Sequence, residues 1–151
     1  ILGAVSVAEG TAAEETDAED QGLISPGTTV KHYAPEARTY LYQGERSAVL
    51  QAMRQAALAH TAAGERVGLL VATEDLSRLE DLPVVLQTVG SRASMSEIAQ
   101  HLYQSLRDLD AADVTVILAR DFGTTGLGLA IRDRLTRAAA GRVISIPDAS
   151  A

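Results

Sequence analysis

Apolar residues between positions 39 and 147 follow two alternating patterns. Short continuous runs rich in Val, Leu and Ile are typical of strands buried in a parallel sheet. Longer segments with apolar residues every three or four positions are typical of helices that cover such a sheet. The predicted strands are residues 39–43, 66–72, 83–89, 113–119 and 142–146. The predicted helices are residues 46–63, a short one at 74–80, a longer one that begins at Ser94, and one from 126 or 127 to 140.

The helix that begins at Ser94 has the clearest start signal. Ser94 is expected to be its N-cap, and Glu97, three residues later, would complete a capping box. Apolar residues then recur at helical spacing and are expected to face the core: Met95, Ile98, Leu102, Leu106 and Leu109. Around the preceding short helix, Glu74, Asp75 and Asp81 are interpreted as caps and solvated charges.

This alternation predicts an α/β fold, a Rossmann-like three-layer α/β/α sandwich with a mainly parallel five-stranded sheet. The strand order cannot be read from the sequence. We divide the chain into four parts. Residues 1–24 are the end of an upstream domain and an acidic flexible linker, and residues 25–38 are a docking arm bounded by prolines. Residues 39–147 are the C-terminal domain, and residues 148–151 are a tail.

Composition excludes several classes of function. The net charge of −7 comes mostly from the first 24 residues, which hold six acidic side chains and no Lys or Arg. The rest lacks the basic excess that nucleic-acid binding requires, so we expect no direct nucleic-acid contact. The absence of Cys, and three widely separated histidines, predict no metal site. No apolar run is long enough for a membrane span.

The arm carries the most unusual side chains. Pro26 and Pro35 favour extended backbone, and a passive linker is usually built from Gly, Ser, Glu and Ala. This one presents Lys31, His32 and Tyr33 in consecutive positions. A cation, a titratable ring and a phenol together favour a segment that docks onto a surface, and the alternative is that they are ordinary exposed linker residues.

The turn after the strand at 113–119 is a second candidate site. It contains Gly123, Thr124, Thr125, Gly126 and Gly128 and opens the last helix. Backbone amides at such a turn can bind an anion, and open parallel sheets bind ligands at this edge. The structural alternative is that Gly126 and Gly128 only permit a tight turn and close packing, and we favour it.

Several motifs resemble two-domain L-threonylcarbamoyladenylate synthases, the Sua-five/YrdC family. In the arm they are Ser25-Pro26-Gly27 and His32-Tyr33-Ala34-Pro35, whereas Thr28-Thr29-Val30 departs from the family pattern. Further along they are Leu106-Arg107, Leu109-Asp110, the run Gly126–Ile131, Asp133-Arg134-Leu135 and Arg137-Ala138-Ala139. Only the linker and the C-terminal domain of that family match, and a YrdC-like catalytic domain is missing.

The resemblance implies a role in tRNA modification. The parent enzyme, a cytoplasmic nucleotidyltransferase, makes threonylcarbamoyl-AMP from L-threonine, bicarbonate and ATP for threonylcarbamoyladenosine synthesis. ATP and Mg²⁺ would bind the missing N-terminal domain, the partner in cis, so this fragment would have no cofactor and no catalytic residues. Lys31, His32 and Tyr33 would help to close the catalytic site, and Arg134 and Leu135 would be fold signatures.

Two other interpretations of the domain stay open. It could be an independent Rossmann-like domain that binds a nucleotide or small anion at the turn between Gly123 and Gly128. It could also be a structural or oligomerising module without a ligand.

Overall fold

The computed structural model describes residues 34–147. The strands are β1 (Arg38–Gln43), β2 (Val67–Val71), β3 (Val85–Thr88), β4 (Val116–Arg120) and β5 (Val143–Ser145). The helices are α1 (Arg46–Ala62), the 3-10 helix η2 (Thr73–Arg78), α2 (Met95–Ala111) and α3 (Leu127–Ala138). The predictions for residues 1–24, for Lys31, His32 and Tyr33, and for the tail fall outside the described residues.

All pairings in the five-stranded sheet are parallel, which confirms the predicted α/β class. The strand order is β3-β2-β4-β1-β5. The central strand β4 pairs with β1 on one side, from Arg38 opposite Val116, and with β2 on the other, from Val67 opposite Val116. Both β2 and β4 are buried at every residue, as expected for strands covered on two faces.

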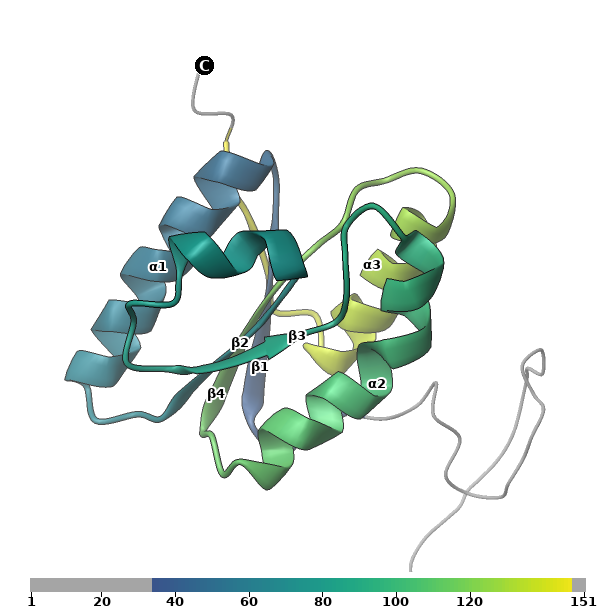
Figure 1. Ribbon diagram of the computed structural model, residues 1–151. Helices are drawn as coiled ribbons and strands as arrows, with labels where there is room; N and C mark the ends of the chain where they lie inside the picture. Colours follow the sequence, from purple (N-terminus) through teal and green to yellow (C-terminus); the bar gives the residue numbers. More distant parts are fainter. Residues whose placement is uncertain (1–33, 148–151) are drawn as a thin grey trace, which may run out of the picture. The chain divides into compact units, whose positions relative to one another are not determined.

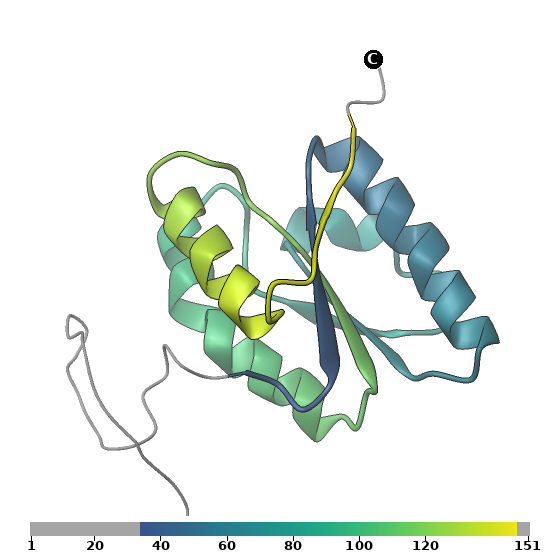
Figure 2. The same cartoon turned by 180° about the vertical axis from the view of Figure 1, so that it is seen from behind.

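Helices cover both faces of the sheet and complete three layers. Figures 1 and 2 show α1 and η2 on one face, with α2 and α3 together on the other. Under α1, Leu50 and Met53 pack with Leu69, Leu118 and other apolar residues in one cluster. On α2, Ile98, Leu102, Leu106 and Leu109 are buried as their spacing predicts, whereas Met95, in the first turn, is only partly buried.

The start of α2 confirms half of the predicted capping box. Ser94 Oγ accepts a hydrogen bond from the N–H of Glu97 at 3.3 Å. The reciprocal bond is absent, because the N–H of Ser94 already donates to the carbonyl of Ser91 at 2.9 Å. The Glu97 carboxylate instead accepts from the N–H of Ser91 at 3.3 Å and ties the preceding loop to the helix.

Candidate functional site

The candidate turn between β4 and α3 has a geometry set by its glycines. Gly123 and Gly126 have φ angles of 102° and 55°, a region that favours glycine. A Cβ added to Gly128 would lie 2.8 Å from the carbonyl oxygen of Phe122. Gly128 therefore allows the first turn of α3 to lie directly against the loop, as the structural alternative predicts. Thr124 and Thr125 are exposed, and anion binding by this turn stays a prediction.

The end of the predicted arm is fixed to the domain at the amino edge of the sheet. The backbone N–H groups of Glu36 and Ala37 donate to the two carboxylate oxygens of Asp110 at 3.0 and 3.3 Å. Asp110 lies in the last turn of α2, and Ala37 is buried. This contact gives a structural reason for the Leu109-Asp110 motif, since the carboxylate positions the chain immediately before β1.

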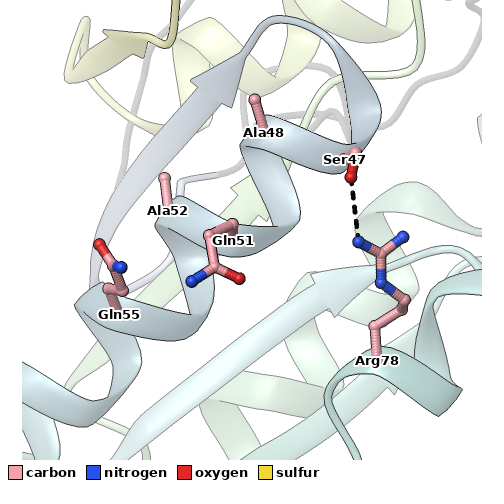
Figure 3. A pocket seen from close by; sticks show the side chains of 6 residues that line it. All are labelled: Ser47, Ala48, Gln51, Ala52, Gln55 and Arg78. Carbon is pink, nitrogen blue, oxygen red and sulfur yellow. Dashed lines mark hydrogen bonds between the residues drawn. The ribbon is translucent and has the colours of Figure 1, made fainter. Parts of the chain in front are cut away.

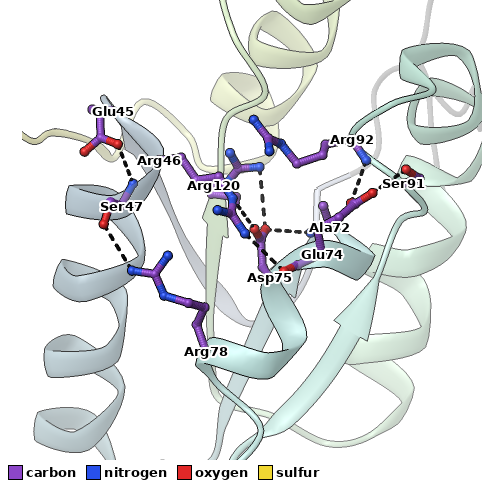
Figure 4. Close-up of polar contacts among 10 residues, drawn as sticks. All are labelled: Glu45, Arg46, Ser47, Ala72, Glu74, Asp75, Arg78, Ser91, Arg92 and Arg120. Atoms are coloured by element: carbon purple, nitrogen blue, oxygen red, sulfur yellow. Dashed lines mark hydrogen bonds and ion pairs between the residues drawn. The ribbon is translucent and has the colours of Figure 1, made fainter.

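A cluster of charged side chains lies at the opposite, carboxyl edge (Figure 4). Its centre is Asp75, which is 0% exposed, so the prediction that Asp75 is a solvated charge was wrong. Asp75 Oδ2 accepts from the N–H of Ala72 at 3.0 Å and thereby caps η2. Its Oδ1 accepts from Nε of Arg46 at 2.9 Å, at the start of α1. The cap was predicted, but the pairing with Arg46 was not.

Arg120, the last residue of β4, lies against this carboxylate. The side chain is buried, and its Nη1 is 3.6 Å from Asp75 Oδ2, an ion pair beyond hydrogen-bond reach. The guanidinium stacks 4.6 Å from the ring centre of Phe122. Burial lowers the pKa of Arg120. The negative charges of Asp75 and Asp121 oppose this shift, whereas the positive charges of Arg46 and Arg92 add to it.

Further ion pairs and hydrogen bonds surround the cluster. Asp121, also buried, pairs with Arg132 on α3. The Glu74 carboxylate accepts from the Ser91 hydroxyl and from the N–H of Arg92. These two bonds hold the pKa of Glu74 at about 2, below its usual 4.5. The cluster thus combines side chains that follow β1, β2, β3 and β4.

A separate groove of about 430 Å³ lies between α1 and η2 (Figure 3). Arg78 is its one charged lining residue, and Arg78 Nη2 donates to Ser47 Oγ at 3.1 Å. The other lining residues are Ala48, Gln51, Ala52 and Gln55. This set of side chains offers neither a nucleophile with a base nor a metal-ligand set.

Residues 34–147 were compared with the requirements of a metal site and of a membrane-spanning helix. In that part of the chain, His, Asp and Glu side chains do not gather in groups of three that could hold a metal ion. None of its helices is long and apolar enough to cross a membrane.

Sequence reasoning missed the charged cluster because its members are far apart in the chain. Each of Arg46, Asp75, Arg92 and Arg120 follows or ends a predicted strand. Carboxyl ends of parallel strands meet at one edge of the sheet, so this shared position was the available signal. The strand order was also needed, because it places β4 between β1 and β2.

The all-parallel sheet, with polar side chains at its carboxyl edge, places this chain in the class of open α/β domains. Residues 2–140 match a family described as "Threonylcarbamoyl-AMP synthase, C-terminal domain", and the chain belongs to this family. The resemblance noted in the sequence is thereby confirmed.

Curated relatives are named as the synthase itself. The chain is 36% identical over 126 residues to threonylcarbamoyl-AMP synthase of Bacillus subtilis, covering 83% of the chain and 35% of the relative. It is 29% identical over 126 residues to the Pyrococcus abyssi enzyme of the same name, covering 81% and 34%. The chain therefore spans about a third of the length of these relatives.

Solved structures agree with the sequence matches. Pyrococcus abyssi Sua5 complexed with L-threonine has a TM-score of 0.68 and 30% identity, covering 82% of this chain and 34% of that one. A C-terminal Sua5 domain from Pyrococcus horikoshii has a TM-score of 0.58 and 28% identity, covering 74% and 99%. A P. abyssi variant with an adjacent histidine and tyrosine both replaced by alanine has a TM-score of 0.65 and 28% identity, covering 74% and 30%.

Proposed function

We propose that this chain serves as the linker and accessory C-terminal domain of a threonylcarbamoyl-AMP synthase. The parent reaction joins L-threonine, bicarbonate and ATP, with Mg²⁺, and releases pyrophosphate. The observation that carries the proposal is the family match over residues 2–140, supported by the curated synthases. An N-terminal catalytic domain in cis supplies the substrate sites.

The domain's role in this proposal is to hold the arm at a fixed point. Asp110 binds the backbone of Glu36 and Ala37, so the arm leaves the domain from the C-terminal end of α2. The segment before that anchor carries Lys31, His32 and Tyr33. A fixed exit point reduces the conformations open to the arm and favours docking at one place on the catalytic domain.

Each arm residue has a chemical role in closing the catalytic site. Lys31 can pair with a phosphate of ATP, His32 can hold the arm by a hydrogen bond, and Tyr33 can pack its ring and donate from its hydroxyl. An adjacent histidine and tyrosine are both replaced by alanine in the P. abyssi variant, which is a reason to test this pair here. His32-Tyr33 is the one adjacent His-Tyr pair in the present sequence.

A chimera tests the accessory role. The portion of the B. subtilis relative outside the matched region is joined to this chain, and pyrophosphate release is measured with ATP, L-threonine, bicarbonate and Mg²⁺. We expect threonine-dependent release from the chimera and none from the isolated 151-residue chain. Threonine-dependent pyrophosphate release by the isolated chain would contradict the proposal, because the catalytic machinery would then lie in the domain itself.

A further inference from the structure

We propose that Arg46, Arg92 and Arg120 form a binding site for a phosphate-class oxyanion at the carboxyl edge of the sheet. The ligand is either a free phosphate or pyrophosphate, or the phosphate groups of a nucleotide. The site is distinct from the glycine-rich turn and from the arm, which joins the sheet at its amino edge.

Arg120 is the first reason for this inference. Its side chain is 7% exposed, yet its Nε and Nη1 have no hydrogen-bond partner among the described residues. Buried polar groups are almost always hydrogen-bonded, and a buried guanidinium without partners is costly. The stacking contact with Phe122 covers one face of the guanidinium but supplies no hydrogen-bond acceptor in its plane. An oxyanion there would satisfy these donors.

The second reason is that Asp75 does not satisfy Arg120, although Arg46 is hydrogen-bonded to Asp75 and, through Nη2, to the carbonyl of Glu74 at 3.1 Å. One oxygen accepts from Arg46 and the other accepts from the N–H of Ala72, at 2.9 and 3.0 Å. Arg120 approaches this second oxygen only to 3.6 Å. Two guanidinium groups therefore share a single carboxylate that is already hydrogen-bonded on both oxygens.

The neighbouring carboxylates are also engaged elsewhere. Asp121 pairs with Arg132, whose Nε is a further buried donor without a partner among residues 34–147. Glu74 binds the Ser91 hydroxyl and the N–H of Arg92. Each of these carboxylates is thus engaged by other donors, and Nε and Nη1 of Arg120 keep no hydrogen-bond partner among residues 34–147.

Arg92 brings a third guanidinium toward the same space. It lies in the loop between β3 and α2, and Figure 4 shows its side chain extending toward Arg46 and Arg120 over Asp75. Its charge, like that of Arg46, disfavours the protonated form of Arg120, which places the groups within electrostatic range. Like charges gathered in this way favour binding of an anion.

The chemistry of the donors favours phosphate. Guanidinium groups present planar pairs of N–H donors that match phosphate oxygens, and such charge-assisted bonds are strong. The position also suits a ligand, because the loops after β2 and β4 lead to opposite faces of the sheet, to η2 and to α3. Crevices of this kind are where open α/β sheets bind ligands.

Calorimetric titration of the 151-residue chain tests the site, with inorganic phosphate, pyrophosphate, AMP and ATP in separate titrations. Sodium chloride keeps the ionic strength constant. Saturable binding of any of these ligands is expected. If ATP and AMP bind no more tightly than phosphate and pyrophosphate, the site takes a free anion. If ATP or AMP binds about tenfold more tightly than phosphate, the ligand of the site is a nucleotide.

Two variants and a control locate the binding. Arg120→Met should weaken it by about tenfold to a hundredfold, since charge-assisted hydrogen bonds are lost. Arg92→Gln should weaken it by about threefold to tenfold, and this exposed position does not threaten the fold. Arg137→Gln removes an exposed cation of α3 that pairs with Asp133, and it should leave binding unchanged.

Absence of binding at millimolar concentrations of all four ligands would overturn the proposal. Binding that Arg92→Gln leaves intact, or that Arg137→Gln weakens equally, would also overturn it. If Arg120→Met fails to fold, Arg92→Gln and its control decide the matter. These outcomes are independent of the synthase assignment, because that assignment rests on the family match and not on anion binding by this edge.

Discussion

Asp75 shows how a single buried side chain organises the carboxyl edge. Its carboxylate joins three segments that are remote in the sequence, through Arg46 on α1, Ala72 before η2 and Arg120 on β4. Removing one member of a buried charge cluster leaves the others without compensation, and that penalty is larger than the net contribution of the intact pair. The cluster therefore restricts which substitutions the fold tolerates.

Replacement of Asp75 by alanine should lower the free energy of unfolding by about 3–5 kcal/mol, since two guanidinium groups lose their carboxylate. Urea denaturation followed by circular dichroism measures this change. Asp81→Ala is the matched control, because Asp81 forms an ion pair with Arg54 at the surface, where screening makes such pairs weak. An Asp75 variant as stable as the Asp81 variant would show that the cluster does not hold this edge together.

For individual residues, some predictions from the sequence were correct and others were wrong, and the reasons can be identified. Ser94 as a cap follows from local chemistry, and the structure confirms it. The burial of Asp75 depends on partners 29 and 45 positions away, Arg46 and Arg120. Local spacing carries no information about such contacts, so the cap was predicted correctly and the buried ion pairs of the same carboxylate were not.

The positions of the helices and strands were predicted well, because the two kinds of element have different patterns of apolar residues. The five strands and the helices α1, α2 and α3 occur where the pattern placed them. The predicted and observed bounds of these strands and helices differ only at their ends. The strand predicted from Asp113 begins at Val116, because Asp113 has a φ of 69° and its N–H bonds to the carbonyl of Asp110, closing the turn after α2.

The buried face of α2 supports a test at the scale of an element. Leu106 is 0% exposed, so Leu106→Ala should cost about 2–5 kcal/mol of unfolding free energy through lost burial and a cavity. Leu58→Ala on α1 is the control, since Leu58 is 47% exposed and its loss should change stability by less than about 0.5 kcal/mol. Chemical denaturation compares the two. Equal effects would mean that the helix face is assigned incorrectly.

At the scale of the whole molecule, the two edges of the sheet have different properties. The amino edge holds the end of the arm through Asp110, and the carboxyl edge holds the charged cluster around Asp75. Motifs in the sequence were sufficient to recognise the family, because they combine specific residues in a fixed order. The strand order and the charged cluster required the structure, since both arise from contacts between distant segments.

We propose that this domain serves a catalytic site outside it by presenting the arm. The most direct measurement is the rate of threonine-dependent pyrophosphate release by the chimera carrying His32→Ala and Tyr33→Ala, relative to the unchanged chimera. A chimera with Thr29→Ala is the control, because Thr29 lies in the same arm and departs from the family pattern. We predict a rate lowered by about tenfold or more in the double variant, since a misplaced arm no longer orients the reactants. An unchanged rate in that variant would show that the arm does not act at the catalytic site.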